Sequence, residues 1–369
     1  MAVGLFQGGP LALDIGASAV TAIQLSGSGN RVKLRRFYES PLPDGLVVDG
    51  EIVDADLFGR ELKTFVQKNG LRGRATQVGV SNQKVIVRNI EMPEMSEAEL
   101  AGAIEYQAQD YIPIPVEDAV LDFQILGRHT DSEGQPRQEV LLVAAQRTMI
   151  DTLLTALKQA GLKVSGVDVS SLALVRALVP GASFLADPAH TGVCRGLVDI
   201  SSSVSTLVVA VDDALKFTRV INFSSDRFAR IISEQRGIPF DDGVRLAQAV
   251  GLPGPLAPEG DVYSPEVVAE TQRQTGKAAA ELVDEIRRSF DYYQGQEGAT
   301  PVRELILSGR GTLLRNLDAH LAEALELPVV IGNPLSRVSD NSSSLTDDTL
   351  ALIGPSLAVA IGLALPEED

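Results

Sequence analysis

The first stretch of the chain alternates between apolar and polar positions and then changes to helical spacing. Alternation over 11–25, around a turn that contains Gly16, predicts a β-hairpin, and 32–40 predicts a third strand. Apolar residues at helical spacing predict an amphipathic helix over 55–68. The short apolar run 76–80 predicts a buried strand.

The same succession of elements returns in the second half of the chain. A hairpin is predicted over 193–210, a third strand over 214–223, a helix over 227–236 and a later strand over 304–307. Between these, helical spacing runs over 239–288 and is interrupted by glycines and prolines. The pattern therefore predicts two similar α/β units, each built on a hairpin.

The first unit contains an insertion with its own pattern. Ser96 and Glu99 form a capping box, which predicts the start of a helix that runs to about Tyr111. The rest of the insertion is predicted as strands over 85–92, 119–126 and 139–145 and a helix over 148–160. A small α/β subdomain is therefore expected inside the first unit.

These elements give the expected domain boundaries. They are 10–83 with 166–192 for the first core, 84–165 for the inserted subdomain, 193–236 with 302–365 for the second core, and 237–301 for a mostly helical subdomain. The Ser/Asp-rich segment 336–348 is expected to be a loop. The apolar run 351–365 is expected to be a buried C-terminal helix, because it is shorter than the ~20 residues of a membrane span.

Composition narrows the class of protein. The formal charge of −17 argues against nonspecific binding to nucleic acid or to an anionic membrane surface. The single cysteine, Cys194, excludes an intrachain disulfide and fits a reducing cytosol. The sequence shows no signal-peptide pattern at its N-terminus.

One short phrase occurs in both halves of the chain, half a chain length apart. Asp, Ile, Ser and Thr recur in register at Asp14/Asp199, Ile15/Ile200, Ser18/Ser203 and Thr21/Thr206. In the first copy, the N–H groups of Gly16, Ala17 and Ser18 could donate to a phosphate, and in the second copy those of Ser201, Ser202 and Ser203. Asp14 and Asp199 could each hold Mg²⁺ through water. For a single copy, a tight structural hairpin is the alternative.

A third turn could join this site. Ser308, Gly309, Arg310 and Gly311 stand between a predicted strand and a helix expected over 312–325. Glycines here allow close backbone approach to a base or ribose, and a helix N-terminus favours anions. An ordinary strand-to-helix turn is the alternative.

The paired Asp-Ile turns and the late Ser-Gly-x-Gly turn resemble the actin-like ATPase superfamily, which includes FtsA, MreB and DnaK. Residues 105–123, with their Tyr-Ile-Pro-x-Pro and Leu-Asp-Phe motifs, are similar to the signature of the PilM family of type IV pilus assembly. The resemblance covers about 11–365. It implies an α/β fold of two duplicated RNase H-like domains, with the inserted subdomain placed as in FtsA.

The resemblance also implies a function and a partner. PilM-like proteins are cytoplasmic adaptors that bind the N-terminal tail of PilN, an inner-membrane protein, in a groove between the first core and the insertion. Glu105, Tyr111 and Phe123 are the expected groove residues. The expectation is therefore a scaffold at the inner membrane that also contacts other pilus components, with self-association left open and no nucleic acid bound.

Several positions depart from the family's nucleotide site. Thr21 stands where the family has Lys, Ser201 and Arg310 stand where it has Gly, and Val244 and Ala247 stand where it has Glu and Lys. Losing one charge-assisted hydrogen bond costs ~1.5–3 kcal/mol. These departures leave the binding of ATP and Mg²⁺ open and argue against efficient hydrolysis.

Two further residues complete the expected site. Arg288 lies in a stretch, 285–289, that supports the resemblance, and it is included among the nucleotide-binding residues. Asp168 is the one candidate for activating water, with a strand-end aspartate as the alternative. The alternative functions are an active actin-like ATPase or filament former, a sugar-kinase-like enzyme, and a pseudo-ATPase scaffold of a related secretion system.

Overall fold

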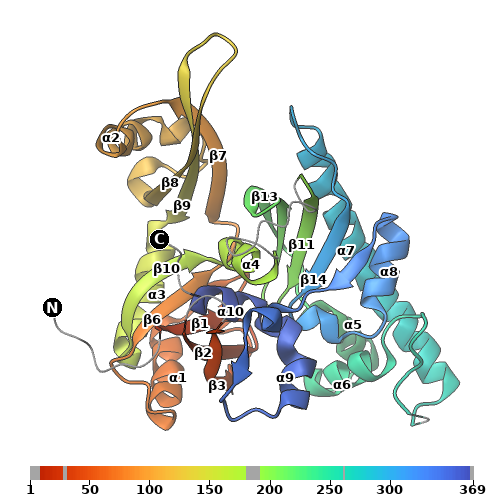
Figure 1. Ribbon diagram of the computed structural model, residues 1–369. Helices are drawn as coiled ribbons and strands as arrows, with labels where there is room; N and C mark the ends of the chain where they lie inside the picture. The colour runs from red at the N-terminus through yellow and green to blue at the C-terminus, as the bar shows by residue number, and fades with distance from the viewer. Residues whose placement is uncertain (1–8, 28–30, 180–191, 261, 366–369) are drawn as a thin grey trace.

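Two large β-sheets and a three-stranded sheet form the framework of the described residues (Figure 1), and β4 Val47–Val48 and β5 Glu51–Ile52 add a two-stranded ribbon. The computed structural model describes residues 9–27, 31–179, 192–260 and 262–365. The first sheet has the order β10-β6-β1-β2-β3-β16, the second β13-β12-β11-β14-β15 and the small one β7-β9-β8. The strands of the first sheet are β1 Leu11–Ile15, β2 Ala19–Ser26, β3 Lys33–Pro41, β6 Ala75–Val80, β10 Lys163–Val169 and β16 Asp340–Asn341. Those of the second sheet are β11 Cys194–Ile200, β12 Ser205–Val211, β13 Ala214–Ile221, β14 Glu304–Ser308 and β15 Val329–Ile331.

The predicted duplication is present in the strand order and in the register. In each large sheet a three-strand antiparallel meander is followed by a fourth strand that pairs parallel with the first. Asp14 lies opposite Thr21 in the first hairpin, and Asp199 lies opposite Thr206 in the second. The repeated phrase therefore marks the same place in two copies of one fold.

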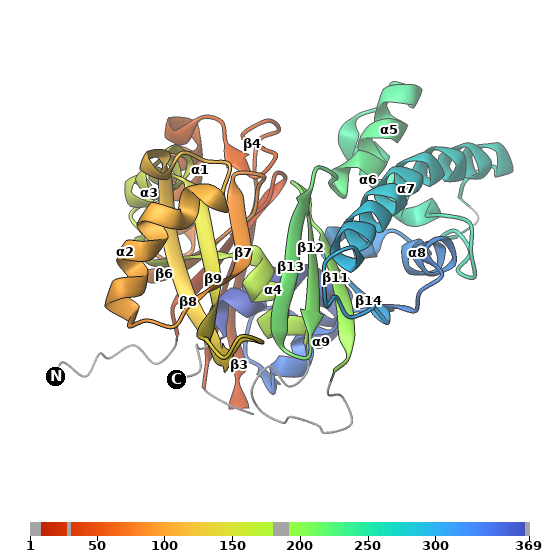
Figure 2. The same ribbon diagram turned by 90° about the horizontal axis from the view of Figure 1, so that it is seen from above.

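α4 Ser170–Leu178 and α10 Ala358–Ala364 lie in the core between the large sheets (Figures 1 and 2). Outside the first sheet lie α1 Ala55–Lys68 and α3 Arg147–Ala160, and outside the second lie α5 Asp226–Arg236, α6 Phe240–Val250, α7 Pro265–Gln294 and α8 Leu317–Leu325. Strand alternation explains this layering, since Leu11 and Leu13 face the outer core and Ala12 faces the inner one.

The insertion is a three-stranded sheet with one helix against it. β7 Val85–Pro93, β8 Ala119–Thr130 and β9 Pro136–Gln146 pack against α2 Glu97–Gln107, and Ser96 caps that helix in the predicted capping box. The α3 helix packs against α1 in the core of the first domain. We therefore propose that the inserted subdomain ends near Gln146 and that α3 belongs to the first core.

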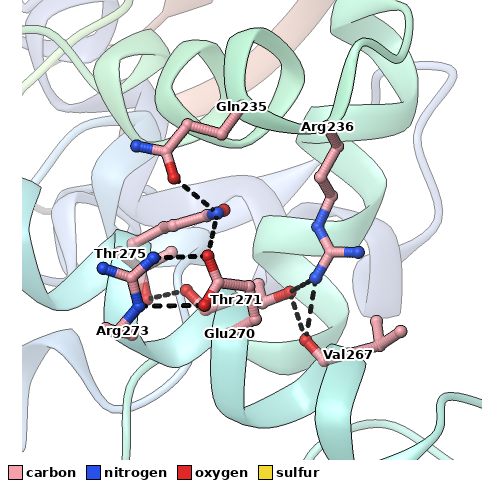
Figure 3. Close-up of polar contacts among 8 residues, drawn as sticks. Gln235, Arg236, Val267, Glu270, Thr271, Arg273 and Thr275 are labelled. Carbon is pink, nitrogen blue, oxygen red and sulfur yellow. Dashed lines mark hydrogen bonds and ion pairs between the residues drawn. The ribbon is translucent and has the colours of Figure 1, made fainter.

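A partly buried polar network joins α5 to α7 in the second half of the molecule (Figure 3). The Gln274 amide donates to Gln235 Oε1 at 2.8 Å and to Glu270 Oε1 at 2.7 Å. Arg236 donates to the Val267 carbonyl at 3.2 Å. These bonds tie α7 to α5.

Two local expectations are wrong. The segment 336–348 is not a simple loop, because β16 pairs with β3 and Asp340 forms an ion pair with Lys33 at 2.8 Å. The helix expected over 312–325 begins at Leu317, because Asn316 has a left-handed backbone.

The apolar C-terminal segment is buried in the core, as expected. It is broken into α9 Asp347–Ile353, a short 3₁₀ turn and α10. Within the described residues, Asp347–Ala364 is the one stretch long and apolar enough to cross a membrane, and 56% of it is buried in the fold. Core helices of folded domains pass the same test, so this composition by itself does not mark a membrane span.

Candidate functional site

The two repeated turns lie opposite each other where the domains meet. Each closes its own hairpin: Gly16 N–H donates to the Ala19 carbonyl at 2.9 Å, and Ser201 N–H donates to the Val204 carbonyl at 3.3 Å. Both turns follow the strand that carries the aspartate, so the Asp14 and Asp199 carboxyls approach the interface from opposite sides.

The turns touch each other directly. Ser202 Oγ accepts hydrogen bonds from Ala17 N–H at 3.1 Å and from Ser18 N–H at 3.4 Å. Ser203 Oγ accepts one from Gly50 N–H at 2.7 Å. Two of the N–H groups that the sequence assigns to a phosphate, those of Ala17 and Ser18, are therefore paired with the opposite turn, whereas those of Gly16 and Ser201 bond within their own hairpins.

A further contact between the domains lies beside them. The hydroxyls of Ser81, which follows β6, and Thr206, on β12, are 2.8 Å apart. Thr206 belongs to the repeated phrase, and Ser81 does not. The interface is thus closed by polar contacts from three separate segments of the first domain.

Asp199 is buried and Asp14 is half-buried, and the Asp14 charge acts on the Asp199 carboxyl. Burial raises the pKa of Asp14 to about 6, and Arg310 partly offsets this. Burial raises the pKa of Asp199 to about 7, against a hydrogen bond from Ser308 Oγ at 2.9 Å, and the Asp14 charge raises it further. A cavity of about 50 Å³ lies between them. Water requires about 10–15 Å³ in this measure, so the cavity holds roughly three to five waters.

Arg310 supplies the cation of the site. Its guanidinium lies 3.6 Å from Glu39 Oε2, and the Thr21 hydroxyl donates to the same oxygen at 3.4 Å. Thr21 stands where the family has a lysine, and Arg310 stands where the family has a glycine. The structure brings both residues to one carboxylate, so the charge comes from the second domain.

A larger cavity of about 260 Å³ adjoins Arg310. Its walls come from both domains and include apolar and acidic side chains, namely Ser18, Glu39, Asp226, Phe228, Val244, Ala247, Arg310 and Gly311. Burial raises the pKa of Asp226 to about 6, and the Arg230 and Arg310 charges lower it. Val244 and Ala247, where the family has charged residues, thus line a cavity that has an apolar wall.

The glycines of the third turn serve packing. Gly309 has φ +85°, and a Cβ there would lie 2.5 Å from the Ile200 carbonyl oxygen. A Cβ on Gly311 would lie 2.6 Å from Ile200 Cβ. The close approach that these glycines permit is therefore made to Ile200 of the second repeat.

Two expected site residues lie in other surroundings. Asp168 pairs with Arg176, and its Oδ1 accepts a hydrogen bond from the N–H of the next residue, Val169, at 2.6 Å. Arg288 is exposed on α7 and pairs with Glu285. Neither lines the two cavities between the domains. Their roles in catalysis and nucleotide binding stay predictions.

The expected partner residues all lie in the insertion. Glu105 is exposed on α2, Tyr111 is partly exposed beyond the end of that helix, and Phe123 on β8 packs against the insertion's core. None of the three lines the cavities at the cleft. The insertion is thus a surface separate from the paired turns.

Sequence reasoning missed four residues of the interface. They are Glu39, Gly50, Ser81 and Asp226. Glu39 had a usable signal, since it lies opposite Thr21 once the second and third strands are paired in register. The other three are brought in by tertiary packing alone.

Comparison with known proteins decides the family. A family model described as type IV pilus assembly protein PilM matches residues 12–368. The chain belongs to the PilM family. The solved PilM-PilN type IV pilus biogenesis complex resembles this chain with a TM-score of 0.80 and 26% identity, over 97% of this chain and 98% of that one.

More distant structures share the fold. MreB5 of Spiroplasma citri bound to ADP matches with a TM-score of 0.54 and 12% identity, over 95% of this chain and 94% of that one. The ethanolamine utilization protein EutJ from Carboxydothermus hydrogenoformans matches with 0.54 and 10%, over 96% and 89%. The expected actin-like α/β fold is therefore confirmed.

The backbone donors of the first turn are already paired in this structure. Ala17 N–H and Ser18 N–H donate to Ser202 Oγ, and a cavity of about 50 Å³ lies beside Asp14 and Asp199. Among the described residues no cluster of three or more His, Cys, Asp or Glu side chains could hold a metal. Asp14 and Asp199 remain a pair of carboxyls beside that cavity.

Proposed function

We propose that this PilM-family chain is a cytoplasmic scaffold of the type IV pilus machine, which binds the cytoplasmic tail of a PilN-like inner-membrane protein. One observation carries the proposal: the chain matches the PilM-PilN complex over nearly its whole length at a TM-score of 0.80. Through that tail the protein would sit at the inner membrane and contact other pilus components.

We propose that the tail lies beside the insertion, near Glu105, Tyr111 and Phe123. The exposure of Tyr111 supports this, since a partly exposed aromatic residue costs little to bury against a partner. Tyr106, in the last turn of α2, is 88% exposed. Two tyrosines at one end of the insertion offer apolar area together with hydroxyl groups, which suits a peptide with mixed side chains.

For the cleft we propose weak ATP binding or none, and little or no hydrolysis. Three observations support this: the turns are paired, the cavity beside Asp14 and Asp199 is small, and Arg310 forms an ion pair with Glu39. The active-ATPase alternative requires the turns to part by enough for a triphosphate. Calorimetry with ATP and Mg²⁺ distinguishes the two, because an active ATPase would give heat of binding and release phosphate.

Titration of a fluorescent PilN-tail peptide with the purified protein tests the partner. We expect saturable anisotropy, and we expect Tyr111→Ala to weaken binding by roughly tenfold, since a buried aromatic contact is worth ~1–3 kcal/mol. Tyr292→Ala is the control, because Tyr292 is also an exposed tyrosine, 64% exposed against 37% for Tyr111, but lies on α7 of the other domain.

The outcome that would overturn the proposal is a flat titration at high micromolar protein, with and without ATP. Equal loss of affinity in Tyr111→Ala and Tyr292→Ala would leave tail binding standing and remove the insertion as its site.

A further inference from the structure

We infer that Ser202 is an internal ligand of the first phosphate-type turn: its hydroxyl oxygen takes the place of a phosphate oxygen, so the two domains close on each other without nucleotide. The inference rests on the proposed state of the cleft as a weak or absent nucleotide site. It does not depend on the partner tail.

The hydrogen bonds carry the first step. A turn that binds phosphate presents successive backbone N–H groups to one oxygen atom. Here Ala17 N–H and Ser18 N–H both point at Ser202 Oγ, at 3.1 and 3.4 Å. One oxygen that accepts two adjacent N–H groups is the arrangement that a phosphate oxygen would make. The serine comes from the same position of the opposite domain's turn.

Lack of space carries the second step. Ser202 is 5% exposed, and a Cβ on Gly16 would lie 2.5 Å from Ser202 Oγ. A phosphate oxygen could not enter between the turn and this hydroxyl while both stay in place. Gly16, which the sequence assigned to phosphate approach, is instead required for the approach of Ser202.

Neighbouring contacts carry the third step. Ser203 Oγ accepts from Gly50 N–H at 2.7 Å, and the Ser81 and Thr206 hydroxyls meet at 2.8 Å. Each of these bonds joins the first domain to the second beside Ser202. Polar contacts from three segments of the first domain therefore hold the turns together, and those to Ser202 are among them.

The decisive measurement is amide hydrogen exchange by NMR at Ala17 and Ser18. Ser202→Ala removes the acceptor of both N–H groups, so their exchange should become roughly tenfold faster. Ser336→Ala is the matched control, because that hydroxyl bonds to the Asn333 carbonyl in an exposed segment far along the chain. It should leave both amides unchanged.

Gly16→Ala tests the same contact from the other side. Its new methyl group displaces the Ser202 hydroxyl, so exchange at Ala17 and Ser18 should rise with Ser202 intact. In the Ser202→Ala background the same change should have a smaller effect, because the 2.5 Å contact with Ser202 Oγ is gone and only the Ala19 carbonyl oxygen at 3.3 Å and the Cβ of residue 202 at 3.9 Å remain close. Thermal unfolding confirms that each variant is folded.

Inorganic pyrophosphate with Mg²⁺ is the binding probe. Isothermal titration should give no heat with the wild-type protein and measurable binding with Ser202→Ala. Unchanged exchange at Ala17 and Ser18 in both variants would overturn the inference, as would wild-type protein that binds pyrophosphate as tightly as Ser202→Ala. Failure of tail binding would affect neither readout, so the two proposals fail separately.

Discussion

At the scale of single residues, equivalent positions of the two repeats have come to interact with each other. Asp14 and Asp199 hold the same place in their hairpins and face one small cavity. Ser202, in the second turn, bonds to the backbone of the first. Position in the repeat was readable from the sequence, but the contact depends on how closely the domains approach.

The pH dependence of stability tests the state of Asp199. Its carboxyl has an ordinary pKa of ~3.9 when unfolded, and burial raises the folded value to about 7. The folded state therefore holds the proton more tightly. The stabilisation that protonation gives is fully present below about pH 4 and is lost as the pH rises through 7.

We expect Asp199→Asn to unfold several degrees above the wild-type protein at pH 8, and the two melting temperatures to converge near pH 4. Thermal unfolding followed by circular dichroism across this range measures it. Asp348→Asn removes an exposed carboxylate and serves as the control for net charge. Parallel pH profiles for wild type and Asp199→Asn would contradict the assignment.

At the scale of elements, the helices between the sheets are held by close backbone approach. A Cβ on Gly362 of α10 would lie 1.9 Å from the Ala173 carbonyl oxygen of α4. Arg176 donates to the Gly362 carbonyl at 3.1 Å, and the same side chain pairs with Asp168. The apolar pattern predicted a buried segment here, but not which glycine the crossing requires.

We expect Gly362→Ala to destabilise the protein by about 1–3 kcal/mol, because the helices must move apart to admit the methyl group. Gly276→Ala is the matched control on α7, where an added Cβ meets nothing within 4 Å. That change should be neutral or stabilise by ~0.5–1 kcal/mol through helix propensity. Chemical denaturation measures both, and equal effects would refute the close crossing.

At the scale of the whole molecule, two kinds of polar contact join the domains beside the apolar core that lies between the large sheets. Ser202, Ser203 and Thr206 make buried or half-buried hydrogen bonds at the paired turns. At the rim, Arg230 pairs with Asp44 at 2.7 Å, and the Asp44 side chain is 80% exposed. Exposed ion pairs contribute little, so domain closure should depend on the turns.

We therefore expect Asp44→Asn to change the free energy of unfolding by less than ~1 kcal/mol and to leave the domains closed. Spin labels on Lys63 of α1 and Glu234 of α5 would report the interdomain distance, since both side chains are exposed. A longer or broader distance in Asp44→Asn would show that the rim ion pair, rather than the turns, holds the closure.

The sequence by itself determined the duplicated fold, the insertion and the candidate turns, because strand alternation, helical spacing and the repeated Asp-Ile phrase are local patterns. It placed α1 at its observed bounds and the capping box at Ser96 and Glu99. The tertiary structure alone decided that Ala17 and Ser18 meet Ser202, and that Gly309 and Gly311 meet Ile200. These contacts join residues from different repeats, and no local pattern encodes the distance between two domains.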